Sequence, residues 1–218
     1  MIKSYDLIVF DWDGTLADST QIIIDSIRTA ADDVGLPIPA RDAASSIIGL
    51  GLGEAIDTLF GDIGNSQFNE LVARYGYHYK SKEHEIPLFY GASDAIPMLV
   101  ERGHLLAVAT GKGRNGLNRA LEKSGISNYF HATRCVDECR SKPHPQMLLE
   151  LMDELGVSSD RTLMIGDTSF DLLMAKNANV ASLAVTYGAH PLDDLLSCGP
   201  VAHFDDFQEL NKWIINNA

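Results

Sequence analysis

The stretch YDLIVFDWDGTLADS, residues 5–19, runs from an apolar segment directly into acidic residues. Residues 5–11 have the composition of a buried strand, and Asp11 and Asp13 lie at its end, followed by Gly14. Two carboxylates at a strand end repel each other and oppose strand pairing. A bound cation would relieve this repulsion, so the aspartate pair indicates a functional site.

Beyond residue 86, apolar strand patterns alternate with helical ones. Strands are expected at 104–110, 129–136, 162–166 and 180–186. Helices are expected at 93–102, from after 110 to about 123, at 145–155 and at 169–177. Such alternation predicts βαβ units, and therefore an α/β fold with a Rossmann-like, mainly parallel sheet and helices on both faces.

The segment between the first strand and this alternation has no strand pattern. A helix is expected over 17–34, and within 36–86 apolar residues recur at helical spacing, as at Phe68, Leu71, Val72, Tyr75 and Tyr79. We therefore predict a small all-helical cap domain inserted after the first strand. The cap would comprise residues 17–86, and the catalytic α/β core residues 1–16 and 87–218.

Composition limits the possible partners. The formal net charge of −13 argues against binding to nucleic acid, because a phosphate backbone requires a basic surface. No apolar run is long enough for a membrane span or an export signal, so no membrane partner and a cytoplasmic location are expected. Cys135, Cys139 and Cys198 lack the spacing of a structural zinc site and are interpreted as reduced thiols. Both a monomer and a homodimer are compatible with the sequence.

Polar side chains stand at the expected carboxyl ends of the strands, where open parallel sheets bind ligands. They are Asp11, Asp13, Thr110, Lys142, Asp167 and Asp171. Carboxylate oxygens suit Mg²⁺, and a lysine together with the ion offsets the charge of a phosphoryl group. The pattern therefore predicts a site for Mg²⁺ and a small phosphorylated metabolite.

Four motifs carry a resemblance to a known family. They are DWDGT from Asp11, VAT ending at Thr110, KPHP from Lys142 and GDTSFD over 166–171. In this order the chain resembles the haloacid dehalogenase-like superfamily, and the helical insertion lies where that family has its C1 cap. The nearest similarity is to the phosphoglycolate phosphatase-like branch. The resemblance implies a Mg²⁺-dependent phosphomonoester hydrolase.

The resemblance also implies roles for individual residues. Asp11 would be the nucleophile that forms an aspartyl-phosphate, and Asp13 the general acid and base. Mg²⁺ would be held by Asp11, the backbone carbonyl of Asp13, Asp167 and, directly or through water, Asp171. Thr110, Gly111 and Lys142 would bind the phosphoryl group. Family members that cleave carbon–halogen bonds lack the second aspartate, because a halide leaves without a proton.

Neighbouring residues also have ordinary interpretations. Asp18 and Ser19 are expected to cap the first helix. Lys112 could bind phosphate or simply begin a helix, and Arg41 is interpreted as a surface residue. Gly51, in the GLGLG stretch at 49–53, is predicted to lie on a cap loop that faces the crevice and contacts substrate.

Other functions remain alternatives. Within the family they are a phosphosugar mutase, a pyrophosphatase and a nucleotidase. The segment GKGRNG over 111–116, with Asp137 about twenty residues beyond it, fits a dinucleotide fingerprint but does not lie on the first βαβ unit. A non-catalytic phosphate acceptor would keep the acid cluster, but such receiver domains have no helical insertion.

Overall fold

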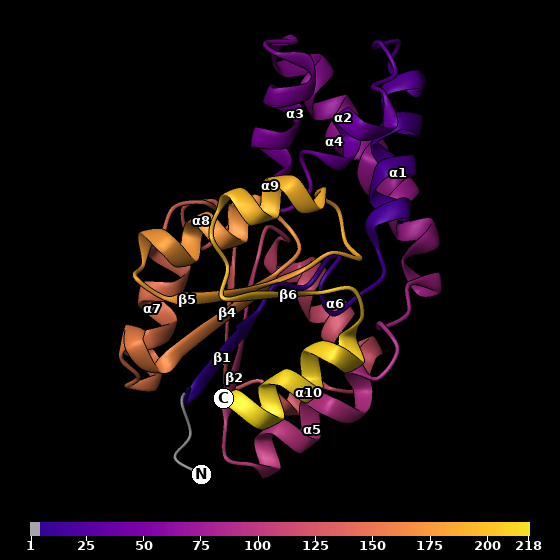
Figure 1. Ribbon diagram of the computed structural model, residues 1–218. Coiled ribbons are helices and arrows are strands. Elements are labelled where there is room, and N and C mark those ends of the chain that lie inside the picture. The colour runs from indigo at the N-terminus through magenta and orange to yellow at the C-terminus, as the bar shows by residue number, and fades with distance from the viewer. Residues whose placement is uncertain (1–4) are drawn as a thin grey trace.

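Six parallel strands form the central sheet in the computed structural model of the protein, which describes residues 5–218 (Figure 1). Their order across the sheet is β3-β2-β1-β4-β5-β6, and every neighbouring pair is parallel. The strands are β1 (Leu7–Phe10), β2 (Leu105–Thr110), β3 (Ala132–Cys135), β4 (Thr162–Gly166), β5 (Ala181–Val185) and β6 (Ala202–Phe204). The predicted Rossmann-like fold class is confirmed.

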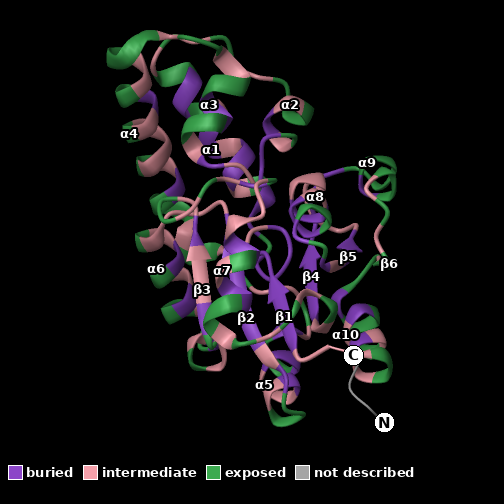
Figure 2. Ribbon diagram, turned by 90° about the vertical axis from the view of Figure 1, so that its left-hand side faces the viewer, coloured by how far each residue is buried: buried purple, intermediate pink, exposed green. Residues whose placement is uncertain are grey.

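Helices cover both faces of the sheet. Alternate residues of β1 face opposite ways, so Ile8 and Phe10 belong to one hydrophobic cluster and Leu7 and Val9 to another. The first cluster includes side chains of α5 (Ala92–Glu101), α6 (Arg114–Ser124) and α10 (Phe207–Asn217). The second includes α7 (Gln146–Leu155) and α8 (Ser169–Asn177), and α9 (Leu192–Ser197) packs beside α8. The central strands are consequently buried on both faces (Figure 2).

A separate group of helices stands beyond the ends of the strands, and the strand arrows point toward it (Figure 2). It consists of α1 (Thr20–Asp33), α2 (Arg41–Ser45), α3 (Leu52–Phe60) and α4 (Gly64–Lys82). Their apolar faces share a hydrophobic cluster of their own, centred on residues such as Ile27, Ile56 and Leu71, each no more than 1% exposed. The expected absence of strands from 36–86 holds.

Two chain segments join this helical group to the sheet, and they pair with each other. The amide of Asp18 donates to the Pro87 carbonyl at 3.0 Å, and that of Phe89 donates to the Leu16 carbonyl at 2.9 Å. Lys123 of α6 donates to the carbonyls of three residues on the returning segment, Glu83, His84 and Ile86. The predicted boundaries after residues 16 and 86 fall in this paired connection. The first four residues of the predicted core lie outside the described residues.

The end of the chain contains elements for which the sequence led to no prediction. These are α9, the three-residue edge strand β6 and α10. Short 3₁₀ turns occur earlier in the chain, at Glu83–Glu85, Ser127–Tyr129 and Ser159–Arg161. The sequence does contain a pattern that indicates α10. Phe207, Leu210 and Ile214 have helical spacing and are buried, and Asp206 caps the helix by accepting from the amide of Glu209 at 2.8 Å.

The separate hydrophobic cluster leads to a prediction about the cap. Leu71→Ala removes a fully buried side chain and should cost about 2–5 kcal/mol of local stability. Because Leu71 belongs to the helical group's cluster and to neither cluster of the sheet, amide hydrogen exchange should accelerate in α1 and α4 while β1 and β4 remain protected. Leu106→Ala, at an equally buried position in β2, is the matched control and should loosen the sheet. Equal acceleration of β1 and α4 in Leu71→Ala would contradict a separate cap.

Candidate active site

The sheet order brings the predicted strand-end residues to one edge. Asp11 directly follows β1, Thr110 ends β2 and Asp167 directly follows β4. Lys142 lies in the loop between β3 and α7, and Asp171 lies in the first turn of α8. Because β1 is paired with both β2 and β4, its carboxyl end lies between theirs. The topology therefore explains why residues so distant in the sequence meet.

Lys142 is the centre of this cluster. Its ammonium group lies 2.8 Å from Oδ1 of Asp11 and 2.6 Å from Oδ1 of Asp171, and all three side chains are at most 1% exposed. Although burial opposes it, the charges of Asp11 and Asp171 raise the pKa of Lys142 above that of a free lysine. The lysine therefore stays protonated and holds both carboxylates in place.

The cluster carries more negative charge than Lys142 balances. Asp11, Asp167 and Asp171 each present a carboxylate oxygen within 4.8 Å of the others. Burial is the main reason that the pKa of Asp11 rises to about 7 and that the pKa of Asp167 rises well above its usual value. Oδ2 of Asp11 is buried and accepts no hydrogen bond within the described structure. Three carboxylates against one ammonium leave two formal negative charges, so these hard oxygen donors fit Mg²⁺.

Asp167 is held rigidly by the chain around it. The hydroxyl of Thr15 donates to Oδ1 and the amide of Ala189 donates to Oδ2, both at 2.8 Å. A side chain at either Gly14 or Gly188 would collide with this carboxylate. Gly14 also has a φ of 81°, a conformation that L residues rarely adopt. These glycines allow the backbone to close around Asp167.

Asp171 is both a helix-capping residue and a member of the cluster. It forms a capping box with Thr168, whose hydroxyl and amide donate to Oδ2 at 2.7 and 3.2 Å. Lys142 contacts its other oxygen, so both oxygens are engaged. Asp171 therefore caps the start of α8 and also belongs to the candidate site. This arrangement suits Asp171 to orienting Lys142.

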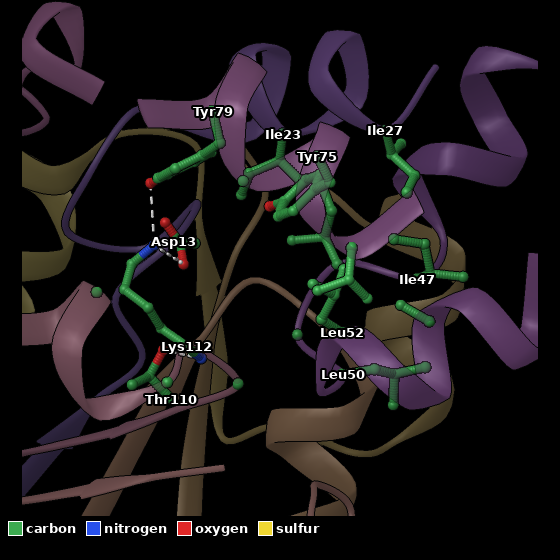
Figure 3. Close-up of a pocket in the computed structure, with 18 of the residues that line it drawn as sticks. Asp13, Ile23, Ile27, Ile47, Leu50, Leu52, Tyr75, Tyr79, Thr110 and Lys112 are labelled. Atoms are coloured by element: carbon green, nitrogen blue, oxygen red, sulfur yellow. Dashed lines mark hydrogen bonds and ion pairs between the residues drawn. The ribbon is translucent and has the colours of Figure 1, made fainter. Parts of the chain in front are cut away.

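Asp13 is not part of this group of three acids and lies beside Lys112 and Tyr79, below the cap (Figure 3). Its Oδ2 lies 3.0 Å from the ammonium of Lys112, which also donates to the hydroxyl of Tyr79 on α4 at 2.9 Å. Ser19 donates to Oδ1 of Asp13 at 2.8 Å. Ser19 occupies the expected N-cap position of α1, but its side chain makes no capping hydrogen bond, because it binds Asp13 instead. No pattern in the sequence indicates the contact between Lys112 and Tyr79.

The cap rests on the loop after β2. A Cβ atom at Gly111 would lie 2.5 Å from the carbonyl oxygen of Gly49 and 2.7 Å from that of Leu50. Only glycine permits this approach. Gly51, predicted to contact substrate, instead faces the core. Its amide donates to the Ser141 hydroxyl at 3.2 Å, and it does not line the cavity described next.

A cavity of about 660 Å³ lies between the cap and the core. Asp11, Asp13, Thr110, Gly111 and Lys112 line its floor, Gly113, Gly116 and Arg119 add to the core side, and cap residues line the rest (Figure 3). Arg41 is not part of the lining; it pairs with Asp25 at 2.8 Å on the surface, as its ordinary interpretation expects. The size and position of the cavity suit a small organic molecule attached to a phosphoryl group at the aspartates.

The possible dinucleotide fingerprint has a structural explanation. GKGRNG leads from β2 into α6, but both oxygens of Asp137 accept from the amide of Arg114 at 3.0 Å. The acid therefore sits at the N-terminus of α6, where a pyrophosphate would have to bind. This segment closes one wall of the cavity through Gly111, Lys112 and Gly113.

Comparison with known proteins adds independent findings. The haloacid dehalogenase-like hydrolase family matches residues 8–185. The chain is 34% identical to "Probable phosphatase IndB" of Dickeya dadantii, over 94% of this chain and 91% of that protein. It is 30% identical to the phosphoglycolate phosphatase of Rhodospirillum rubrum, over 95% and 90%. A crystal structure described as a predicted phosphoglycolate phosphatase from Haemophilus somnus superimposes with a TM-score of 0.86 at 26% identity, covering 97% of this chain and 99% of that one.

The relatives are therefore proteins of similar length that are named as phosphatases, and the crystal structure among them has a similar fold. Within residues 5–218, no helix combines the length and apolar character that crossing a bilayer requires.

The charge imbalance predicts how metal affects stability. Asp167→Asn replaces a buried carboxyl group whose ionisation burial and the neighbouring acids oppose, while the new amide can still accept from Ala189 and donate to Thr15. We expect the metal-free variant to melt at a higher temperature than the metal-free wild type at pH 7.5. Mg²⁺ should stabilise the wild type, by about 2.7 kcal/mol at a hundredfold excess over Kd, and should have little effect on the variant. The measurement is thermal unfolding with and without Mg²⁺.

Asp153→Asn is the control, because Asp153 is an exposed acid on α7 outside the cluster. If Mg²⁺ stabilised Asp167→Asn as strongly as Asp153→Asn, Asp167 would not be a ligand.

Proposed function

The chain belongs to the haloacid dehalogenase-like hydrolases, and we propose that it hydrolyses a small phosphomonoester with Mg²⁺ through an aspartyl-phosphate at Asp11. The similarity to named phosphatases supports this reaction class. One structural observation carries the proposal. Lys142 fixes one oxygen of Asp11 at 2.8 Å, while the other oxygen accepts no hydrogen bond, and Asp11 lines the cavity.

This geometry leaves one oxygen of Asp11 for attack on phosphorus. The new bond joins that oxygen to phosphorus, and the bond between phosphorus and the alcohol oxygen breaks, its electron pair leaving with the alcohol. Asp13 donates a proton to the oxygen of the departing alcohol. A water molecule, deprotonated by Asp13, then attacks the phosphorus, releases inorganic phosphate and restores the Asp11 carboxylate.

The surrounding residues position these two aspartates. Lys112 and Ser19 each contact one oxygen of Asp13 and so hold its carboxyl group toward the cavity. Thr110 and Gly111 line the floor of the cavity beside Asp11 and are proposed to contact the phosphoryl oxygens. Mg²⁺, when bound by Asp11, Asp167 and the backbone carbonyl of Asp13, with Asp171 directly or through water, would supply positive charge for the phosphoryl oxygens.

The two aspartates can be separated by experiment. Asp11→Asn removes the nucleophile, so all hydrolysis should vanish. Asp13→Asn removes the proton donor and acceptor, so hydrolysis of an alkyl phosphate should fall by about 10²–10⁴-fold. With p-nitrophenyl phosphate the leaving group needs little protonation, but hydrolysis of the aspartyl-phosphate still needs the base. Stopped-flow absorbance should show a burst approaching one nitrophenol per active site, followed by a slow steady rate.

Asp18→Asn is the matched control, since Asp18 is an exposed acid on the same segment and should show wild-type kinetics. A single slow phase in Asp13→Asn, with both substrate types equally slowed, would be incompatible with a dual role for Asp13.

A further inference from the structure

We propose that this active site prefers phosphomonoesters whose leaving group is uncharged, largely apolar and about as large as a phenylalkyl alcohol, over small carboxylates such as phosphoglycolate. The inference rests on the proposed phosphatase function and adds the substrate class. It comes from the part of the cavity that the cap supplies.

Aliphatic side chains make up most of this part of the cavity. They come from α1, from the loop before α3, from α3 itself and from α4, and all reach the same space (Figure 3). The main ones are Ile23, Ile27, Ile47, Leu50, Leu52 and Val72. A surface of this kind is stabilised by contact with apolar groups and offers nothing to replace the hydration of a charge.

The cationic side chains that line the cavity are already engaged or lie at its rim. Lys112 pairs with Asp13 and donates to Tyr79, and Arg119 pairs with Glu83 at 3.0 Å. Lys80 is exposed to solvent. A carboxylate placed among the aliphatic residues would thus lose its water without gaining a counter-charge, and it would enter beside the acidic cluster.

The size of the cavity also favours a bulky leaving group. Its volume of about 660 Å³ lies within the range of pockets that hold drug-sized ligands. A two-carbon acid attached to the phosphoryl group would leave most of the apolar surface uncovered. An aromatic or similarly bulky alcohol would cover it.

Tyr75 places a polar group among these apolar side chains. The hydroxyl of Tyr75 makes no hydrogen bond to any described residue, and its ring lies among the labelled aliphatic side chains (Figure 3). Tyr75 stacks against Tyr79, with ring centroids 5.9 Å apart. Burial raises the pKa of Tyr75, so the hydroxyl is a neutral donor and acceptor. It would pair with a single polar group on an otherwise apolar alcohol.

Two matched substrate pairs test the inference. Phosphoglycolate and its primary amide have the same shape, so their comparison isolates the carboxylate charge. Ethyl phosphate and 2-phenylethyl phosphate have leaving groups of similar acidity, so their comparison isolates apolar bulk. We expect kcat/KM on the order of tenfold higher for the amide than for phosphoglycolate. We expect it on the order of a hundredfold higher for the phenylethyl than for the ethyl ester, given the effect of each added methylene in an apolar pocket.

A variant that fills the cavity provides a second measurement. Gly76 of α4 lines the cavity, and a Cβ atom there would meet nothing within 4 Å. Gly76→Phe should reduce the phenylethyl-to-ethyl ratio of kcat/KM at least tenfold. Gly76→Ala, which adds only a methyl group, should keep the ratio within about twofold. Far-UV circular dichroism and the thermal shift with Mg²⁺ report whether each variant is folded.

The possible results separate this inference from the proposed function. If no ester is hydrolysed at a rate that Asp11→Asn abolishes, both the function and the inference fail. If esters are hydrolysed but phosphoglycolate exceeds its amide, the inference alone is overturned, and a selective loss of phosphoglycolate turnover in Lys112→Met would identify Lys112 as the carboxylate receptor. Equal kcat/KM for the ethyl and phenylethyl esters would also overturn it.

Discussion

The buried contact of Lys142 with Asp11 and Asp171 is the interaction on which the rest of the site depends. Removing one partner from a buried ion pair typically costs about 3–5 kcal/mol, because the remaining charge has neither water nor a counter-ion. Here the lysine comes from the loop after β3, and the acids come from the end of β1 and the start of α8. The contact therefore ties three separate parts of the chain together and fixes the orientation of Asp11.

The sheet topology makes that contact possible, and small residues complete it. With β1 in the middle of the order β3-β2-β1-β4-β5-β6, Asp11 lies between residues from β2 and β4. Gly14 and Gly188 leave room for the Asp167 carboxylate, and a side chain at Gly166 would collide with Asp171. The acids are thus packed tightly and away from solvent. The residual negative charge is a feature that the surrounding fold enforces.

Much of this arrangement could be predicted from the sequence, because it follows from periodicity and from residues at strand ends. β4 and α8 begin and end where their apolar patterns do. The contacts between cap and core could not be predicted, since they join residues distant in the sequence. Lys112 reaches both Asp13 and Tyr79, and Gly49 and Leu50, rather than Gly51, line the cavity. The edge strand β6, three residues long and only partly buried, has too little pattern to recognise.

The site thus combines the acidic cluster around Lys142 with apolar cap residues on the opposite side of the cavity. The acidic cluster determines the reaction. If Asp11 is the nucleophile, phosphorus is attacked twice, and each attack inverts its configuration. The most direct test uses a substrate whose phosphoryl group is chiral through its three oxygen isotopes, transferred to an acceptor alcohol by the wild-type protein with Mg²⁺. Double displacement at Asp11 predicts net retention of configuration at phosphorus. Net inversion would mean that the acceptor attacks the substrate directly, and it would contradict the aspartyl-phosphate.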